Sequence, residues 1–312
     1  MCSSAGDVFS LMTLLFTIAA LLASVLSLCD AGEPVSEARE KKIRAVYASI
    51  GADKEKGFER LRKPTSNEWL GQEDEEPQSL EDFMICKRPQ LSRERFVIVM
   101  QPIGKFDEAQ RQLIKELTEY AGAFFQLPVR IADDLNLETL DKGLSLSRRV
   151  PLDRFSSRTQ YDASRILEVV MNNLIPADAA LYIGITNGDL YADQQNLFGY
   201  ASTTERTGLI SFARYYKSGK KGPDQATKRR AFKFTNHEIG HMLGLQHCVF
   251  YRCSMNGCSS LKEADGSLNF CPVCQQKLKW ALEYDEGKRR AQLETFYRAH
   301  GVLDENPKAR AK

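Results

Sequence analysis

The sequence predicts a mixed α/β (α+β) fold, in which a mixed sheet is packed against helices. Short apolar runs of strand length recur along the chain, and two longer segments with helical periodicity lie between them. A histidine-rich segment with helical spacing follows these elements. Hydrophobic residues make up 43% of the 312 residues, which allows a substantial core.

The expected strands and helices follow one another from residue 96 to residue 214. Residues 96–100 (FVIVM) form a buried strand, and Asp107 with Gln110 forms a capping pair that begins a helix continuing through Tyr120. The other expected elements are a strand at 129–132, a helix at 162–175 that Pro176 ends, a strand at 180–186 closed by Asn187-Gly188, and strands at 198–202 and 207–214.

The stretch HEIGHMLGLQHC contains three of the four histidines of the chain. His237 and His241 are four residues apart, so on one face of a helix their imidazoles can meet one zinc ion. Glu238 is the candidate general base, because its carboxylate could take a proton from a metal-bound water. Gly244 permits a positive φ and can end the helix, which lets His247 return as a third ligand. Three protein ligands and one open position are typical of a catalytic zinc that hydrolyses peptide bonds.

The pattern HExxHxxGxxH resembles the signature of the metzincin metallopeptidases, and the residues after it are similar to the archaemetzincin branch. The stretch WLGQEDEEPQSLEDF at 69–83 and the TGLISFARYY segment look like the longer members of that family. The match runs through HEIGHMLGLQHCVFYRCSMNG and the later NFCPVCQQKL. The resemblance implies a metzincin-like fold with a zinc-binding active-site helix, a Met-turn and C-terminal helices. It also implies that Met255 forms the apolar floor beneath the catalytic histidines. Finally, it implies a second, structural zinc held by Cys248, Cys253, Cys271 and Cys274.

Four thiolates in two close pairs suit a tetrahedral zinc on their own chemistry. Pro272 suits a first helical turn, so Cys271 can cap a helix that runs toward Trp280. Disulfides, or a redox pair formed by Cys271 and Cys274, stay open as alternatives. Cys258 lies outside the family pattern. The expected metal content is therefore two zinc ions per chain.

Residues 8–28 are 21 consecutive residues without a charge, long enough to span a bilayer. They are expected to form a signal peptide cleaved after Ala31, a lipoprotein signal acylated at Cys29, or an uncleaved membrane anchor. The expected location is exported or membrane-associated, and a cytoplasm-facing membrane anchor is the alternative because basic residues follow the run. Export would expose the downstream cysteines to oxidation, so that disulfides would compete with the structural zinc.

Four parts are expected along the chain: a hydrophobic signal peptide or anchor (1–31), an N-terminal extension (32–89), a catalytic domain with the second zinc site (90–284) and a helical tail (285–312). The extension contains the acidic stretch GQEDEEPQ, and the tail contains a helix at 286–300 with Gly301 as its C-cap. His300 is expected to interact with the terminal carbonyls of that helix rather than to bind metal.

A net charge of +2 favours no polyanionic partner, so nucleic acid is not an expected target. The basic run at 217–230 contains glycine and proline and is expected to be a solvated loop. The expected partner is a peptide or protein substrate, and the protein is expected to be a monomer. In the family that the chain resembles, an edge strand near the cleft pairs with substrate, and residues 198–214 are the candidate; an ordinary internal or solvent-facing strand is the alternative.

The sequence favours a zinc metallopeptidase in which Glu238 activates the attacking water. A catalytically idle zinc-binding or interaction protein of the same fold is an alternative, although its usual sign, loss of Glu238 or of a ligand, is missing. A structural zinc module is a further alternative, in which a fourth protein ligand closes the histidine site. Tyr251, Asn256 and Cys258 are the candidates for that ligand.

Overall fold

The computed structural model describes residues 35–154, 156–216 and 222–302. The chain divides into two compact units, Met1–Ala45 and Val46–Lys312. Of the first unit the structure describes the beginning of helix α2 (Val35–Ile50). The predicted segment 1–31 lies outside the described residues, and the boundaries predicted after residues 89 and 284 stay predictions.

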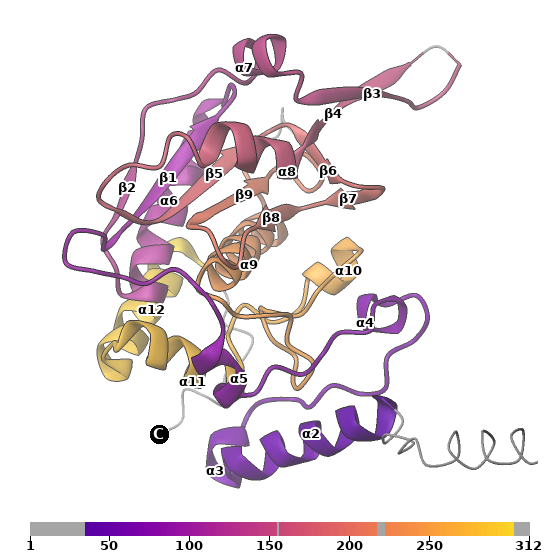
Figure 1. The fold of residues 1–312 in the computed structure, drawn as a ribbon. Helices are drawn as coiled ribbons and strands as arrows, with labels where there is room; N and C mark the ends of the chain where they lie inside the picture. Colours follow the sequence, from indigo (N-terminus) through magenta and orange to yellow (C-terminus); the bar gives the residue numbers. More distant parts are fainter. Residues whose placement is uncertain (1–34, 155, 217–221, 303–312) are drawn as a thin grey trace, which may run out of the picture. The chain divides into compact units, whose positions relative to one another are not determined.

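A five-stranded sheet lies at the centre of the second unit, in the order β2-β1-β5-β9-β8 (Figure 1). Its strands are β1 (Val97–Ile103), β2 (Val129–Ile131), β5 (Ala179–Thr186), β8 (Gly199–Ala201) and β9 (Thr207–Ser211). The first four strands of the order run parallel, and β8 is antiparallel at the edge. Every residue of β1 and β5 is buried, which explains why their sequences are mostly apolar. The predicted mixed α/β fold and these strands are confirmed.

Helices cover both faces of this sheet. Helices α6 (Glu108–Phe125) and α9 (Gln225–Met242) pack against each other, and α9 contacts β8 and β9 (Figure 1). On the opposite face, Val99 and Leu209 join one hydrophobic cluster with α8 (Ala163–Ile166) and the π-helix η1 (Leu167–Met171). The packing of α9 brings the histidine helix to the antiparallel edge of the sheet.

The predicted helix at 162–175 differs from the observed one in its hydrogen bonding. It begins at the N-cap Asp162 as α8, but its second half is the π-helix η1, where the amide of Asn172 donates to the carbonyl of Leu167 at 2.9 Å. Apolar periodicity over so short a segment does not distinguish an α-helical turn from a π-helical one.

The basic run at 217–230 is not the solvated loop that its composition predicts. Helix α9 begins at Gln225, because the Asp224 side chain accepts a hydrogen bond from the Thr227 amide and caps the first turn. The prediction is wrong for residues 225–230, and residues 217–221 lie outside the described part of the chain.

A second sheet was not expected from the sequence. It has the order β3-β4-β6-β7, with β3 (Ser147–Pro151), β4 (Ser157–Asp162), β6 (Asp189–Ala192) and β7 (Gln195–Leu197). Strands β3 (SRRVP) and β4 (SRTQYD) consist mostly of polar residues and are only partly buried. They lack the apolar alternation by which a strand is recognised in a sequence. The short helix α7 (Leu137–Leu144) before them was not expected either.

The remaining helices are α3 (Ala52–Glu55), α4 (Trp69–Gln72), α5 (Leu80–Ile85), α10 (Leu261–Ala264), α11 (Pro272–Leu282) and α12 (Glu286–His300). The predicted start of α11, with Cys271 as N-cap and Pro272 at its first position, is observed. The C-cap of α12 is Gly301 with a φ of 63°, also as predicted. His300 differs: its imidazole contacts the carboxylate of Glu119 at 3.0 Å, because α12 packs on α6.

The predicted location, exported or membrane-associated through residues 8–28, with a cytoplasm-facing membrane anchor as the alternative, is wrong. A spanning helix needs about 20 predominantly apolar residues. Among the described residues, no helix combines the length and the apolar character needed to cross a membrane. The longest described helices, α6 and α9, have 18 residues each and carry charged side chains along their length. Residues 8–28 lie outside the described residues.

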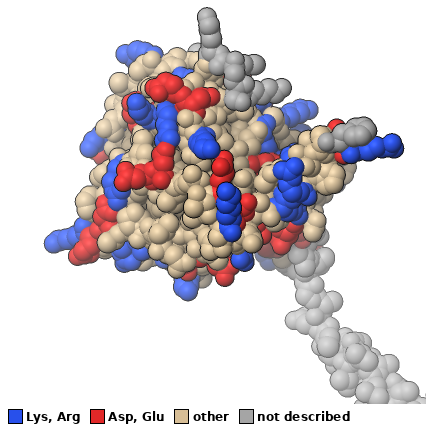
Figure 2. Space-filling view, turned by 90° about the horizontal axis from the view of Figure 1, so that it is seen from above, with Lys and Arg blue, Asp and Glu red and all other residues tan. Residues whose placement is uncertain are grey.

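Acidic and basic side chains are interspersed on the face of the molecule that Figure 2 shows, and no continuous basic surface forms there. Nucleic-acid binding proteins gather Lys and Arg on one face or along one groove. This face is in keeping with the modest net charge of +2. The expectations of no nucleic-acid partner and of a monomer stay predictions.

The capping box of α6 gives a test of the predicted helix start. Replacing Asp107 by Ala removes the acceptor of the Gln110 amide, at 2.8 Å, and should lower the free energy of unfolding by about 0.5–2 kcal/mol. Asp107→Ser keeps an acceptor and should recover most of that loss. Urea unfolding followed by circular dichroism measures both variants, and equal stability of Asp107→Ala and the wild type would contradict the role of the cap.

Candidate functional site

The last turns of α9 bring His237 and His241 together. Their Nε2 atoms lie 3.0 Å apart. His237 Nδ1 lies 2.9 Å from the carbonyl oxygen of Ser254, and His241 Nδ1 lies 2.8 Å from that of Leu245. Because a carbonyl oxygen can only accept, each Nδ1 is the protonated nitrogen and each Nε2 presents a lone pair. Two lone pairs at this distance repel each other unless a cation lies between them.

A turn at Gly244 returns the chain to the two helical histidines. Gly244 has a φ of 92°, a conformation that disfavours side chains, and its amide donates to the carbonyl of His241 at 2.8 Å. The ring of His247 then lies 5.1 Å from that of His237 and 4.8 Å from that of His241, measured between centroids. One ligand atom from each histidine lies within 4.8 Å of the others, so the structure brings together the three residues that the motif predicts.

Burial keeps the helical histidines neutral. Burial is the largest cause that lowers the pKa of His237 well below its usual range, followed by the charges of the other two imidazoles. Burial, with the nearby His247, lowers the pKa of His241 to about 3. A neutral imidazole is the form that binds metal. The three nitrogens fit a tetrahedral zinc, in which two bound nitrogens lie roughly 3.3 Å apart.

Glu238 lies beside the histidines with a side chain that is almost fully buried. Burial raises the pKa of its carboxyl well above the usual range. A Cβ built on Gly199 would overlap with the Glu238 carboxylate, so the edge strand β8 lies directly against this side chain. Glu238 is therefore positioned between the helical histidines and the edge of the sheet.

A cleft of about 480 Å³ opens over these residues. Its walls are β7 and β8 on one side and the segment around Trp69 and Glu73 on another, and His237, Glu238, His241 and His247 contribute to its lining. Of the predicted edge-strand region, β8 lies at the edge of the sheet and beside the cleft, whereas β9 is internal. The interpretation as an edge strand is therefore correct for β8 only.

The four cysteines of the predicted structural site are gathered in one buried cluster. Their Sγ atoms lie within 4.8 Å of one another, and those of Cys248 and Cys271 are 3.6 Å apart. Two sulfurs on one tetrahedral zinc lie roughly 3.8 Å apart, so the spacing fits zinc. The amide of Cys271 donates to Cys253 Sγ at 3.2 Å. All six cysteines among the described residues are free, so neither disulfides nor an oxidised redox pair is observed.

The cysteine cluster also carries a thiolate-stabilising network. Burial opposes ionisation of Cys248, but hydrogen bonds from the neighbouring thiols outweigh it and lower its pKa below the usual range. The pKa of Cys271 is raised, first by burial and then by its hydrogen bond to Cys248. One thiolate is therefore stabilised by its neighbours, which is the starting condition for metal binding.

Met255 packs against the helix that carries His237 and His241. Its side chain is fully buried, and a Cβ added to Gly240, which lies between the two helical histidines, would overlap with Met255 Sδ. The carbonyl of Met255 accepts from the Cys248 amide at 2.8 Å. The methionine thus connects the helix that carries the histidines to the start of the cysteine cluster.

The three residues suspected of closing the histidine site do not join the histidine group. The hydroxyl of Tyr251 donates to Glu55 at 2.5 Å, and the amide nitrogen of Asn256 donates to the carbonyl of Cys248 at 2.6 Å. Cys258 lines the cleft, but its thiol is outside the group of ligand atoms that the three histidines form. Burial raises the pKa of Cys258 to about 11.

The sequence did not reveal the contacts made by residues 69–78. Glu75 Oε1 lies 2.6 Å from His247 Nδ1, and the Gln78 side chain contacts the Gly244 turn. Both residues belong to the acidic stretch GQEDEEPQ at 71–78, and they are 172 and 166 positions away from their partners. Nothing in the local pattern signals such a contact.

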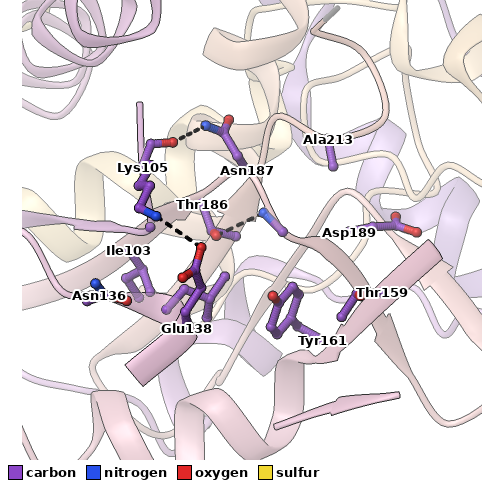
Figure 3. A pocket seen from close by; sticks show the side chains of 13 residues that line it. Ile103, Lys105, Asn136, Glu138, Thr159, Tyr161, Thr186, Asn187, Asp189 and Ala213 are labelled. Carbon is purple, nitrogen blue, oxygen red and sulfur yellow. Dashed lines mark hydrogen bonds and ion pairs between the residues drawn. The ribbon is translucent and has the colours of Figure 1, made fainter. Parts of the chain in front are cut away.

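A second cavity, of about 300 Å³, lies at the carboxyl ends of β1 and β5 (Figure 3). Lys105 and Glu138 contribute to its lining, but they are exposed and form an ion pair at 3.1 Å. Asp189 is paired with Arg214 at 2.7 Å. The described metal-ligand groups are the histidine and cysteine groups, and neither includes a residue of this cavity. The histidine cleft is therefore the candidate functional site.

Comparison with known proteins gives consistent similarities. Residues 156–280 match the model of peptidase family M54. The chain is 30% identical over 263 residues to archaemetzincin-2 of Mus musculus, covering 73% of this chain and 71% of the relative. It is 31% identical over 194 residues to the archaemetzincin of Thermococcus kodakarensis, covering 60% and 97%. A crystal structure of archaemetzincin from Methanopyrus kandleri has a TM-score of 0.47 at 24% identity, covering 62% of this chain and 98% of that one.

The contact between Gly240 and Met255 gives a test of the floor beneath the histidines. Gly240→Ala forces Met255 and Phe270 to shift in a packed region, so we expect a loss of about 1–3 kcal/mol in the free energy of unfolding. The matched control is Gly143→Ala in helix α7, where nothing lies within 4 Å of an added Cβ and stability should stay equal or rise. Thermal unfolding compares the two, and equal behaviour would contradict close packing at Gly240.

Proposed function

Because this chain belongs to the archaemetzincin family of zinc-dependent peptidases, we propose that it hydrolyses peptide bonds at a zinc ion held by His237, His241 and His247. The observation that carries the proposal is that one ligand nitrogen from each of three histidines lies within 4.8 Å of the others, and that these histidines line one cleft together with a buried glutamate. When bound, zinc acts as a Lewis acid on the scissile carbonyl and lowers the pKa of a bound water to about 7.

The general base of the proposed reaction is Glu238. It is the residue directly after the first histidine, so its carboxylate is placed beside the ligands rather than among them. Its position in the lining of the cleft lets it accept the proton of the attacking water and deliver a proton to the leaving amine. Because the Glu238 carboxylate is almost fully buried, solvent screens its electrostatic interaction with the reacting groups only weakly.

The substrate is proposed to bind in extended form along β8. In the described five-stranded sheet β8 pairs with β9 on one side and occupies the edge on the other, where backbone groups can pair with a peptide. Tyr200 at the middle of β8 is 37% exposed and lines the cleft, so its side chain is available to a substrate residue. Contact between β8 and Glu238 would align the scissile bond with the base.

A second zinc is proposed at Cys248, Cys253, Cys271 and Cys274. Four buried thiols within 4.8 Å, with backbone amides donating to Cys253 Sγ, are typical of a closed structural site. Cys248 directly follows His247, so the position of the third catalytic ligand depends on this cluster. The two proposed zinc ions would thus have different roles, catalysis at the histidines and structure at the cysteines.

The role of Glu238 can be tested by Glu238→Gln. This variant keeps the size of the side chain but cannot accept a proton, so cleavage of a mixed peptide library should fall by roughly 10²–10⁴-fold. Its zinc content should equal that of the wild type. Glu294→Gln, the same change at an exposed position of α12, is the control and should leave cleavage unchanged. Wild-type turnover in Glu238→Gln would contradict the assignment of Glu238 as the general base.

Zinc per chain tests the two metal sites separately. Elemental analysis of the full chain purified under reducing conditions should give two zinc ions, and His241→Ala should retain one. His300→Ala, which removes the histidine outside the group, should retain two. One zinc in the wild type that survives in His241→Ala would contradict the histidine site, whereas loss of one zinc under oxidising conditions would favour disulfides in the cysteine cluster.

A further inference from the structure

The segment formed by residues 69–78 contacts the ring of the third histidine and the backbone of the turn that precedes it. Glu75 Oε1 lies 2.6 Å from His247 Nδ1. The Gln78 side chain donates to the Gly244 carbonyl at 3.0 Å and accepts from the Gln246 amide at 3.1 Å. The turn that returns His247 to the other histidines is therefore held from outside by a segment far away in the sequence.

Glu75 is itself held in place. Trp69 Nε1 donates to the same carboxylate oxygen at 2.8 Å, and the indole packs edge-on to the His247 ring with centroids 5.4 Å apart. The Trp69 amide donates to Glu263 at 2.7 Å, and a Cβ on Gly257 would overlap with the indole, so the tryptophan is packed against the following loop. Trp69, which is packed and hydrogen-bonded itself, thus fixes the position of the Glu75 carboxylate beside His247.

The acceptor at this point is a carboxylate oxygen. Two N–H groups, Trp69 Nε1 and His247 Nδ1, lie within hydrogen-bond distance of Glu75 Oε1, at 2.8 Å and 2.6 Å. The Glu75 side chain is 23% exposed and that of His247 is 20% exposed, so solvent screens the contact only in part. Glu75 is therefore a carboxylate that accepts the Nδ1 proton of His247.

The three histidines differ in what accepts their Nδ1 proton. His237 and His241 donate to backbone carbonyls of Ser254 and Leu245. His247 donates to a carboxylate, and it lies in a loop rather than on the helix. A carboxylate on the outer nitrogen sets the tautomer and ring orientation and makes the inner nitrogen a stronger metal ligand. His247 is the one histidine of the three that no helix holds in place, and its Nδ1 proton has the strongest acceptor, the Glu75 carboxylate.

We infer that Glu75 is a positioning residue for the zinc site, which orients His247 and strengthens its bond to the metal. The inference rests on the proposed function, because it requires zinc at the histidines. Glu75 lies outside residues 156–280, which the family model matches, so the inference comes from the contacts of this chain. Gln78 supports the same ligand through the backbone.

The test compares Glu75→Ala and Glu75→Gln with Glu76→Ala, an exposed neighbour that serves as the matched control. The zinc dissociation constant of the histidine site is measured in the full-length protein by competition with a chromophoric chelator. Glu75→Ala should weaken zinc binding by roughly 10–100-fold, as is usual for the loss of an outer partner of a metal ligand. Glu75→Gln should recover part of the affinity, because its amide oxygen still accepts the Nδ1 proton without the charge.

The outcomes separate this inference from the proposed function. The positioning role is supported if Glu75→Gln weakens zinc binding at the histidines and Glu75→Ala weakens it further. Glu76→Ala should bind zinc as the wild type does, and all variants should retain the cysteine-bound zinc. Wild-type affinity in Glu75→Ala overturns the positioning role while leaving zinc catalysis in place. If the His241→Ala variant contains as much zinc as the wild type, both the positioning role of Glu75 and the proposed zinc site at the histidines are overturned. Equal weakening in Glu75→Ala and Glu76→Ala also contradicts the inference, because it would indicate a general disturbance of the segment.

Discussion

Three imidazoles each bring one nitrogen toward a common point, and the lone pairs of the two helical histidines repel each other there unless a cation lies between them. The Nε2 atoms of His237 and His241 are 3.0 Å apart although both carry lone pairs. Burial lowers the pKa of both rings, so protonation does not relieve the repulsion. The outer nitrogens of all three rings are hydrogen-bonded, and the surrounding turns, cysteine cluster and packed methionine hold the rings against that repulsion.

Features that depend on neighbouring residues could be predicted from the sequence. The histidine helix with its turn at Gly244, the capping pair of Asp107 and Gln110, and the helix that begins after Cys271 are determined within a few positions. Capping and positive φ are local properties of the backbone, and four-residue spacing places side chains on one helix face. The confirmed strands β1 and β5 have the same character, since each contains an apolar run of four or more residues.

What could not be predicted depends on partners far apart in the sequence. The second sheet pairs polar strands whose composition resembles that of loops, and the partner of His247 lies 172 residues before it. The acidic stretch that contains Glu75 has the composition of a solvated segment. The partly buried contact of Glu75 differs from the exposed side chains beside it only in what the tertiary fold places next to Glu75.

The two metal-ligand clusters stabilise each other through the chain that joins them. Cys248 follows His247 directly, and its amide donates to the carbonyl of Met255 at 2.8 Å. The carbonyl of Ser254, the residue before Met255, in turn accepts from His237 Nδ1 at 2.9 Å. Closing the cysteine cluster at Cys248 and Cys253 therefore positions the acceptor of one histidine and the backbone of another. With the two proposed zinc ions bound, the closed cysteine site would therefore hold the backbone beside the histidine site, whose fourth coordination position stays open.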